Sequence, residues 1–301
     1  MAKFSVLLAV STLALLAAQA NAWGVVCYIF LSFEEQLGHQ TVAELGAANL
    51  TPAAKAKLTK IIAAGRANNV FTGLEAAAVW PDQNRDAGGA SSSSHFINYD
   101  DNPQSGQCSS AQIPDSCNGA AGCVTSSIGT FAAALASANP NSAAAAQNLA
   151  LVIHFVGDVA QPLHATGFKR GGNQVNVKWG SKKTNAHSVW DTQLVQAAAD
   201  NAGGIDAWVQ NLQSLSSDDD ASTACVASAG ATDAAALTQC AIAWSQESEA
   251  LTCSAVFGDA FTTGDLSGSY EETVEPVVNQ QIARAGLRLS AVLNKVLGGS
   301  Q

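Results

Sequence analysis

The sequence predicts an all-α protein, a single mainly helical domain with few short strands. Long segments rich in Ala, Leu, Val and Ile recur along its 301 residues, of which 48% are hydrophobic and 13% charged. A strand-like alternation of apolar and polar residues occurs in one short segment. No internal repeat or Pro-rich linker divides the chain, and its length suffices for one large core.

Four segments carry the helical signals. Thr51 and Pro52 are typical of a helix start, because Pro is tolerated in the first turn, and this helix is expected to run through Ala64. Residues 143–160 predict a buried helix that stops near Pro162. Residues 232–253 have a similar composition and predict another helix. In residues 274–297 the apolar side chains recur at near-helical spacing, at Val277, Ile282, Leu287, Val292 and Leu293.

The remaining segments are expected to be short or irregular. Residues 174–179 alternate between polar and apolar side chains and predict one arm of a short hairpin. Residues 86–94, 99–127 and 214–231 are rich in Gly, Ser, Asn or Asp and predict loops.

The first 22 residues predict a secretory signal peptide. Lys3 precedes an apolar run, and Ala20, Asn21 and Ala22 form a small-x-small cleavage site before Trp23. An uncleaved membrane anchor is the alternative, because residues 25–33 are also apolar. The polar residues near the cleavage site favour a secreted, extracellular protein with no stable membrane association.

Export would place the seven cysteines in an oxidising environment, where disulfides persist. Six of them are sufficient for three bridges, whose connectivity the sequence does not determine, and Cys27 is left over. The absence of a CxxC pair argues against a thiolate zinc site. The six candidates for these bridges are Cys108, Cys117, Cys123, Cys225, Cys240 and Cys253.

The charge is unevenly distributed. The formal net charge is −10 and no basic stripe of the kind found in duplex-binding proteins is visible. Five cationic residues nevertheless lie between His164 and His187. They form either a solvated loop or a basic rim that attracts a phosphate-bearing substrate, and nothing in the sequence implies a protein partner. These residues are Lys169, Arg170, Lys178, Lys182 and Lys183.

All five histidines stand at spacings that suit a metal site. His154 and Asp158, and likewise His187 and Asp191, are four residues apart and would share one face of a helix. Nitrogen and oxygen donors of this kind suit zinc. With His39, His95, His164 and Asp82 the candidates number eight, more than one tetrahedral ion needs, which favours two or three ions acting on a phosphoryl group. The amine and carbonyl of a mature N-terminal Trp23 are further donors, unless Trp23 is merely the first residue.

These residues resemble the plant and fungal single-strand-specific nucleases, trinuclear-zinc enzymes related to bacterial zinc-dependent phospholipase C. The resemblance runs from Trp23 to the C-terminus. Its motifs are Trp23-Gly24, Gly38-His39, Trp80-Pro81-Asp82 with Arg85, His95-Phe96-Ile97, residues 154–191, residues 244–248 with Cys253, and residues 270–294. It implies a mostly helical fold with a trinuclear zinc cleft between helices.

The resemblance also implies which residues hold each of three Zn²⁺ ions. Asp82, His95 and His154 would hold the first, and Asp158 would bridge it to the second. The second ion would also take Trp23 and His39. The third would be held by His164, His187 and Asp191. A hydroxide between the two bridged ions would attack phosphorus, so Asp82 and Asp158 take part in catalysis.

Three further residues are expected to contact the substrate by the same resemblance. Arg85 would stabilise charge on the phosphate, with a surface salt bridge as its alternative role. Asn173 would hydrogen bond to the base, beside glycines that allow close approach. Phe96 would either stack on a base or pack in the core. Asn98 stands where the family often has Asp, so the base preference stays open.

The chain departs from the family near its start. Residues 25–37 separate Trp23 from His39, whereas the family places Trp-Gly and Gly-His a few residues apart. We interpret this atypical insertion as a translated intron, with a genuine loop insertion as the alternative. Residues 23–301 would then form one nuclease domain.

The expected function is a secreted zinc-dependent phosphodiesterase that hydrolyses single-stranded DNA and RNA to 5′-nucleotides, with 3′-nucleotidase activity. One alternative is phospholipase C-type hydrolysis of lipid head groups, against which the predicted base site argues. The other is a secreted zinc-binding protein without turnover, disabled by the insertion.

Overall fold

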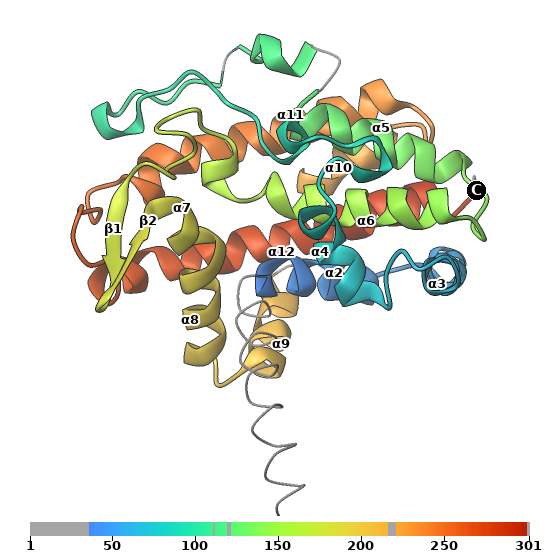
Figure 1. Cartoon of the computed structure of the whole chain (residues 1–301), viewed down its shortest axis with the longest axis horizontal. Helices are drawn as coiled ribbons and strands as arrows, with labels where there is room; N and C mark the ends of the chain where they lie inside the picture. The colour runs from blue at the N-terminus through green and yellow to red at the C-terminus, as the bar shows by residue number, and fades with distance from the viewer. Residues whose placement is uncertain (1–35, 111, 119–121, 216–220, 300–301) are drawn as a thin grey trace, which may run out of the picture.

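A computed structural model describes residues 36–110, 112–118, 122–215 and 221–299 and shows a mainly helical fold (Figure 1). The predicted all-α class is confirmed. The helices are α2 (Leu37–Ala48), α3 (Pro52–Ala67), α4 (Leu74–Gln83), α5 (Val124–Ser137), α6 (Ala143–Asp158), α7 (Ala186–Ser188), α8 (Leu194–Asn201), α9 (Ile205–Leu215), α10 (Ala221–Ser228), α11 (Ala234–Leu251) and α12 (Ser269–Leu297). The strands are β1 (Asn176–Trp179) and β2 (Lys182–Asn185).

Helix α6 is the centre of the larger of two hydrophobic clusters. It packs against α3, α4 and α5, and α5 in turn packs against α11. Ser142 caps its N-terminus by accepting a hydrogen bond from the backbone N–H of Ala145 at 3.1 Å. From Leu149 to Val156 every side chain is buried, so this helix is covered on all sides. Its end at Asp158, four residues before Pro162, agrees with the prediction.

Helix α12 joins the two hydrophobic clusters. It crosses the molecule from the β1–β2 hairpin to the C-terminus (Figure 1). Its first half packs against α8 and α9 and buries Tyr270 and Val274 in the smaller cluster. Its second half buries Leu289 and Leu293 in the α6 cluster. It begins at Ser269 rather than at the predicted residue 274, because buried Tyr270 and the acidic first turn belong to the helix.

The other sequence expectations have mixed outcomes. Thr51 caps α3 and Pro52 opens it, and residues 174–179 lie in the antiparallel β1–β2 pair as predicted. The helix predicted at 232–253 is α11, followed by a π-helical turn over Thr252–Val256. The prediction of a loop over residues 214–231 is wrong for residues 221–228, which form α10. That helix is held by the Cys225–Cys240 disulfide and by Lys295, which donates to the carbonyl of Ala227 at 2.9 Å.

Three disulfides connect the six expected cysteines. The pairs are Cys108–Cys253, Cys117–Cys123 and Cys225–Cys240. The first joins residues 145 positions apart and ties the loop after residue 99 to the π-helical turn that follows α11. Cys27, the predicted signal peptide 1–22 and most of the insertion lie outside the described residues. Within the described ranges, no helix has the length and apolarity needed to cross a membrane.

Candidate metal centre

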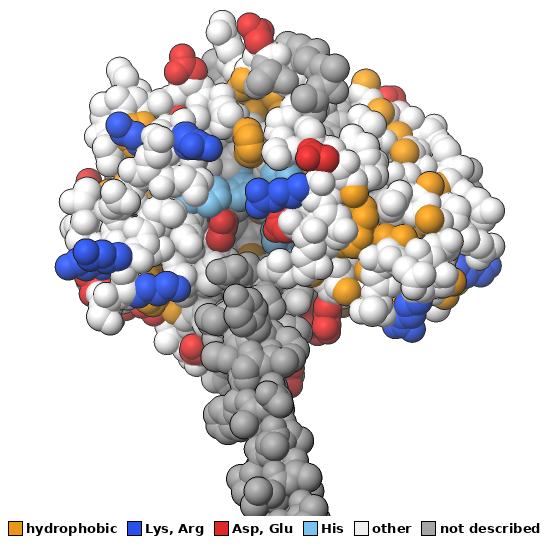
Figure 2. Space-filling model, in the orientation of Figure 1, with side chains coloured by type: hydrophobic (Ala, Val, Ile, Leu, Met, Phe, Trp, Pro, Cys, Tyr) orange, Lys and Arg blue, Asp and Glu red, His pale blue; other side chains and the backbone are white. Residues whose placement is uncertain are grey.

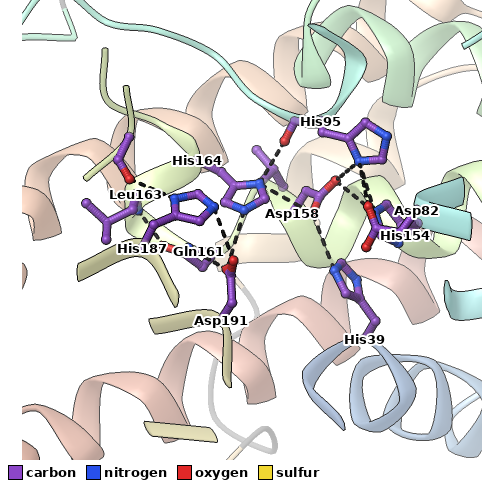
Figure 3. A network of polar contacts seen from close by, with 12 residues as sticks. His39, Asp82, His95, His154, Asp158, Gln161, Leu163, His164, His187 and Asp191 are labelled. Atoms are coloured by element: carbon purple, nitrogen blue, oxygen red, sulfur yellow. Dashed lines mark hydrogen bonds and ion pairs between the residues drawn. The ribbon is translucent and has the colours of Figure 1, made fainter. Parts of the chain in front are cut away.

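Four of the five histidines line one cleft of about 1230 Å³ between the two hydrophobic clusters. The fifth, His154, is fully buried and packs against two of them, His39 and His95. Figure 2 shows histidine side chains in this hollow, with Lys or Arg and Asp or Glu side chains beside them. The predicted ligands come from separate elements of the fold, which converge in Figure 3. They are His39 on α2, Asp82 on α4, His95 in the 3-10 turn Ser92–His95, His154 and Asp158 on α6, His164 in the turn Pro162–His164, His187 on α7, and Asp191 in the π-helical turn Val189–Gln193.

The first group consists of Asp82, His95 and His154, whose candidate ligand atoms lie within 4.8 Å of one another. Nδ1 of His95 lies 3.0 Å from Nε2 of His154. Oδ1 of Asp82 lies 3.7 Å and 3.6 Å from these two nitrogens. Two ring nitrogens that face each other beside a carboxylate are well placed to bind a cation, and this donor set suits zinc.

Asp158 lies at the middle of the centre and is only 1% exposed. Its two oxygens face four histidines at distances between 3.1 and 3.4 Å, more than any other carboxylate here. One oxygen faces His95 and His154, and the other faces His39 and His164. This division of the two oxygens suits a carboxylate that bridges neighbouring ions.

A separate group on the other side of Asp158 consists of His164, His187 and Asp191. Nε2 of His187 lies 3.1 Å from one oxygen of Asp191, and Nε2 of His164 lies 3.5 Å from the other. The two imidazole rings are stacked with centroids 5.0 Å apart. The expected spacing of four residues between His187 and Asp191 therefore brings both side chains together, although the chain passes from α-helix to π-helix between them.

Backbone carbonyls orient three of the five rings. Nδ1 of His154 donates to the carbonyl of Ala78, Nδ1 of His164 to that of His95, and Nδ1 of His187 to that of Gly171, at 2.8, 2.8 and 2.7 Å. A histidine whose Nδ1 carries the proton offers the lone pair of Nε2 to a metal. The three carbonyls thus fix the tautomer that presents Nε2 to the centre.

Charge at the centre favours a bound cation. Burial alone would raise the pKa of Asp158, but the charges of His154 and His164 hold it well below its usual range. Burial likewise opposes protonation of His164, yet the charge of Asp158 and the contact with Asp191 raise its pKa to about 10. Without metal, Asp158 is therefore ionised and His164 carries an extra proton, which a metal must displace on binding.

The cleft also receives the three residues expected to contact substrate. Arg85, Phe96 and Asn173 all line it, as does Asn98. Phe96 is 36% exposed, which favours the stacking role over core packing. Nδ2 of Asn173 donates to the carbonyl of Arg170 at 2.9 Å. Asn173 therefore closes an unusual turn in which four consecutive residues, 169–172, have positive φ.

Of the five cationic residues between His164 and His187, all are exposed and Arg170 lines the cleft. Lys178 lies beside Asp265, whose pKa is lowered by hydrogen bonds to Ser267 and Gly180 and by the Lys178 charge. Arg170 is therefore placed as the interpretation of a basic rim requires. The three lysines of the β1–β2 hairpin do not line the cleft.

Two positioning residues were not identified from the sequence. Gln161 donates from Nε2 to Asp191 at 2.7 Å and orients that carboxylate. Gly157 lies in α6 beneath His39, whose ring stacks on His154 with centroids 3.9 Å apart. A Cβ atom added to Gly157 would lie 2.6 Å from Nδ1 of His39. The signal in the sequence is a glycine directly before Asp158, because a residue without a side chain allows another ring to come close to the helix.

Gly157→Ala is therefore expected to push His39 out of the centre without harming the fold. Alanine favours a helix over glycine by up to about 1 kcal/mol, so the metal-free protein should melt no lower than the parent. Activity should fall by about 10- to 100-fold, as when a ligand loses its orientation. Gly38→Ala is the matched control, because its Cβ would meet its nearest neighbour at an ordinary 3.6 Å. Unchanged zinc content in Gly157→Ala would contradict this role for the glycine.

Trp23 and Gly24 lie outside the described residues, as does the insertion up to residue 35. The last residue of the insertion, Leu37, is buried in the smaller hydrophobic cluster and is the first residue of α2. The end of the insertion is therefore part of the packed fold, and His39 is the third residue of the same helix.

The fold and this centre define a disulfide-bonded helical protein whose His and Asp clusters are suited to several metal ions. A profile of the S1/P1 nuclease family matches residues 35–298. The chain is 31% identical to Nuclease P1 of Penicillium citrinum over 277 residues, which cover 87% of this chain and 97% of that protein. It is 30% identical to Nuclease S1 of Aspergillus oryzae over 270 residues, covering 86% and 90%. Endonuclease 2 of Arabidopsis thaliana is 26% identical over 279 residues, covering 87% and 89%.

The protein belongs to the S1/P1 nuclease family. The resemblance inferred from the motifs is confirmed, and the chain is a nuclease, a hydrolase that acts on phosphodiester bonds.

Proposed function

We propose that this protein is a secreted, zinc-dependent phosphodiesterase that cleaves single-stranded DNA and RNA to 5′-nucleotides and also acts as a 3′-nucleotidase. The observation that carries the proposal is the set of three adjacent His and Asp groups in one cleft beside an exposed aromatic ring. Family membership supports a nuclease, and the residues of this cleft support the finer assignment.

Three zinc ions fit the donors present. Asp82, His95 and His154 would hold one, and His164, His187 and Asp191 another. His39 and Asp158 would contribute to the third, for which the family resemblance adds Trp23. Nδ1 of His39 is buried and finds no hydrogen-bond partner in the described part of the chain, which suits a ring whose only polar role is at the metal. Bound zinc supplies Lewis acidity and lowers the pKa of water to about 7.

The chain's own residues would bind and orient the substrate. Arg85 brings a fixed positive charge into the cleft beside Asp82, where charge develops on the phosphate oxygens. Phe96 presents an exposed ring on which an unpaired base can stack. Because a paired base is already stacked within its duplex, this contact favours single strands.

The direct test is hydrolysis by the zinc-loaded protein of denatured DNA, native DNA and a choline phospholipid. We expect rapid release of 5′-nucleotides from denatured DNA, much slower cleavage of native DNA and no head-group release from the lipid. Hydrolysis of the phospholipid alone would identify a phospholipase C. Binding of zinc without hydrolysis of any of the three substrates would identify a non-catalytic zinc protein.

Asn173→Ala is expected to weaken discrimination between nucleotides by about fivefold, the effect of one hydrogen bond worth about 1 kcal/mol. Hydrolysis of bis(p-nitrophenyl) phosphate, which has no base, should change little, because the metal ligands and Arg85 act on phosphate. The measurement is kcat/KM for 3′-nucleotides with different bases and for this diester. An equal loss on both kinds of substrate would show that Asn173 serves only the turn closed by its bond to Arg170.

Localisation is part of the same proposal. Three disulfides are consistent with an oxidising compartment, and secretion would follow from cleavage before Trp23. N-terminal sequencing of protein from the culture medium tests this, since Trp23 as the first residue is the expected result and retention of residue 1 would contradict it.

A further inference from the structure

A second cluster of ligand atoms lies apart from the candidate metal centre and shares no residue with it. Asp101 follows the short bridge between Tyr99 and Thr166, and Glu249 lies near the end of α11. Candidate ligand atoms of Asp101, Cys108 and Glu249 lie within 4.8 Å of one another. Because Cys108 is bonded to Cys253, its sulfur is not a thiolate, and the two carboxylates are the ligands that remain.

Glu249 is an unusual residue for this position. It is only 2% exposed, and its Oε1 is buried without a hydrogen-bond partner among the described residues. The backbone N–H of Ser109 donates to this carboxyl group. No Lys, Arg or His forms an ion pair with Glu249 or Asp101 within the described ranges.

Asp101 is only partly compensated by hydroxyl groups. The hydroxyl of Thr166 donates to Oδ1 of Asp101 at 2.5 Å, and that of Thr252 lies 3.5 Å from Oδ2. The Thr252 hydroxyl is 2.7 Å from the carbonyl of Glu249, which takes its single proton. The backbone N–H groups of Asp101 and Phe168 also donate to the carboxyl group of Asp101. All these donors are neutral, and no cationic side chain pairs with either carboxylate within the described ranges.

Such a pair is costly if both groups are ionised, because buried charge needs a partner. Burial raises the pKa of Asp101, and burial followed by the charge of Asp101 raises that of Glu249. Tyr99, the nearby phenol, also has a raised pKa, mainly through burial, and so contributes no charge. A proton or a bound cation must therefore balance the pair.

We propose that Asp101 and Glu249 hold a hard divalent cation, Ca²⁺, between the loop after Tyr99 and α11. The ligands are oxygens only, which disfavours zinc and other softer ions. A surface hollow lined by Asp100, Asp101, Asn102, Gln107 and Ser109 opens beside them. It leaves room for the water and side-chain oxygens that complete the six to eight ligands of Ca²⁺, whereas Mg²⁺ requires stricter octahedral geometry.

The position gives such an ion a structural role. The loop after Tyr99 continues the segment that carries His95 and Phe96, and Tyr99 pairs through its backbone with Ala165 and Gly167 beside His164. The Cys108–Cys253 disulfide already links this loop to the π-helical turn that follows α11. A Ca²⁺ ion would add a second link, between the loop and α11 itself, and would hold both carboxylates ionised.

The test is the melting temperature of zinc-loaded protein, kept in excess zinc, with and without millimolar CaCl₂. Near neutral pH, saturating Ca²⁺ should raise the melting temperature of the parent by about 5 °C or more, and MgCl₂ should do much less. Glu249→Gln should abolish the Ca²⁺ response while zinc content stays unchanged. Glu44→Gln is the matched control, because Glu44 is exposed on α2 and should leave the response intact.

The pH dependence gives an independent readout. A carboxyl group whose pKa is raised on folding stabilises the fold when protonated, and that stability is lost as the pH rises through the raised value. Without Ca²⁺, the parent should therefore lose stability toward neutral pH, and Glu249→Gln should lose less. Equilibrium dialysis against radioactive Ca²⁺ should find one tightly bound ion in the parent and none in Glu249→Gln. An equal Ca²⁺ response in both proteins, or none in the parent, would overturn the proposal, and the latter result would leave a shared proton as the balancing charge.

Discussion

Asp158→Asn is expected to lower kcat/KM on single-stranded DNA by on the order of 10³-fold or more, equivalent to about 4 kcal/mol of transition-state stabilisation. Asp158 faces four histidines, and one of its oxygens lies toward each side of the centre. Asparagine keeps the shape of the side chain but removes its charge and one of its two acceptor oxygens. The variant should therefore lose about two of the bound zinc ions.

Asp191→Asn should be less damaging. Asp191 faces only His164 and His187, and it is held by Gln161 at the edge of the centre. Its loss should release about one zinc ion and leave the neighbouring pair in place. Elemental analysis and steady-state kinetics on both variants measure the difference.

The exposed Asp86, which lies near the cleft but does not line it, provides a control. Asp86→Asn removes the same charge from the same region, and asparagine tolerates its left-handed backbone, so zinc and activity should be retained. Similar losses of zinc and activity in Asp158→Asn and Asp191→Asn would count against a bridging role for Asp158.

The elements with strong local signals were predictable from the sequence. A capping Thr before Pro52 specifies the start of α3, and the run of apolar residues after Ser142 specifies α6. Helix α10 was missed because its stability comes from partners distant in the sequence, the Cys225–Cys240 disulfide and α12. Tertiary contacts of this kind leave no periodic signal within the eight residues of the helix.

The ligand candidates of the centre were predictable where spacing places two donors on one helical turn, as for His154 and Asp158. The family resemblance, not the spacing, supplied the grouping of Asp82 with His95. Gly157 and Gln161 act through a close approach and a hydrogen bond that only the folded arrangement creates. The carbonyls that orient His154, His164 and His187 belong to residues of no distinctive type, so sequence reasoning could not identify them.

Removal of zinc by a chelator is expected to abolish hydrolysis and to lower the melting temperature by on the order of 10 °C or more. The candidate ligands come from α2, α4, α6, α7 and neighbouring turns, so bound ions would add links between elements that otherwise meet through packing and a few hydrogen bonds. A ligand that binds only the folded protein stabilises it, and metal sites of this kind couple binding to folding. Refilling with zinc should restore both properties, and refilled protein should contain about three ions. One ion or none, with full activity, would contradict the trinuclear assignment.

The pH dependence of the chelated protein should reveal which protons replace the metal. The pKa of His164 rises from 6.5 to about 10 in the metal-free fold, because the charges around it outweigh its burial. A histidine with a raised pKa stabilises the fold fully below its unfolded value, and this stability is lost as the pH rises toward the folded value. The melting temperature of the chelated protein should therefore fall between about pH 6.5 and pH 10, whereas the zinc-loaded protein, whose His164 is neutral, should show no such loss. Zinc added to the metal-free protein near pH 8 should also release protons, which a pH indicator detects. A melting temperature that falls equally with and without zinc would mean that His164 is not a ligand.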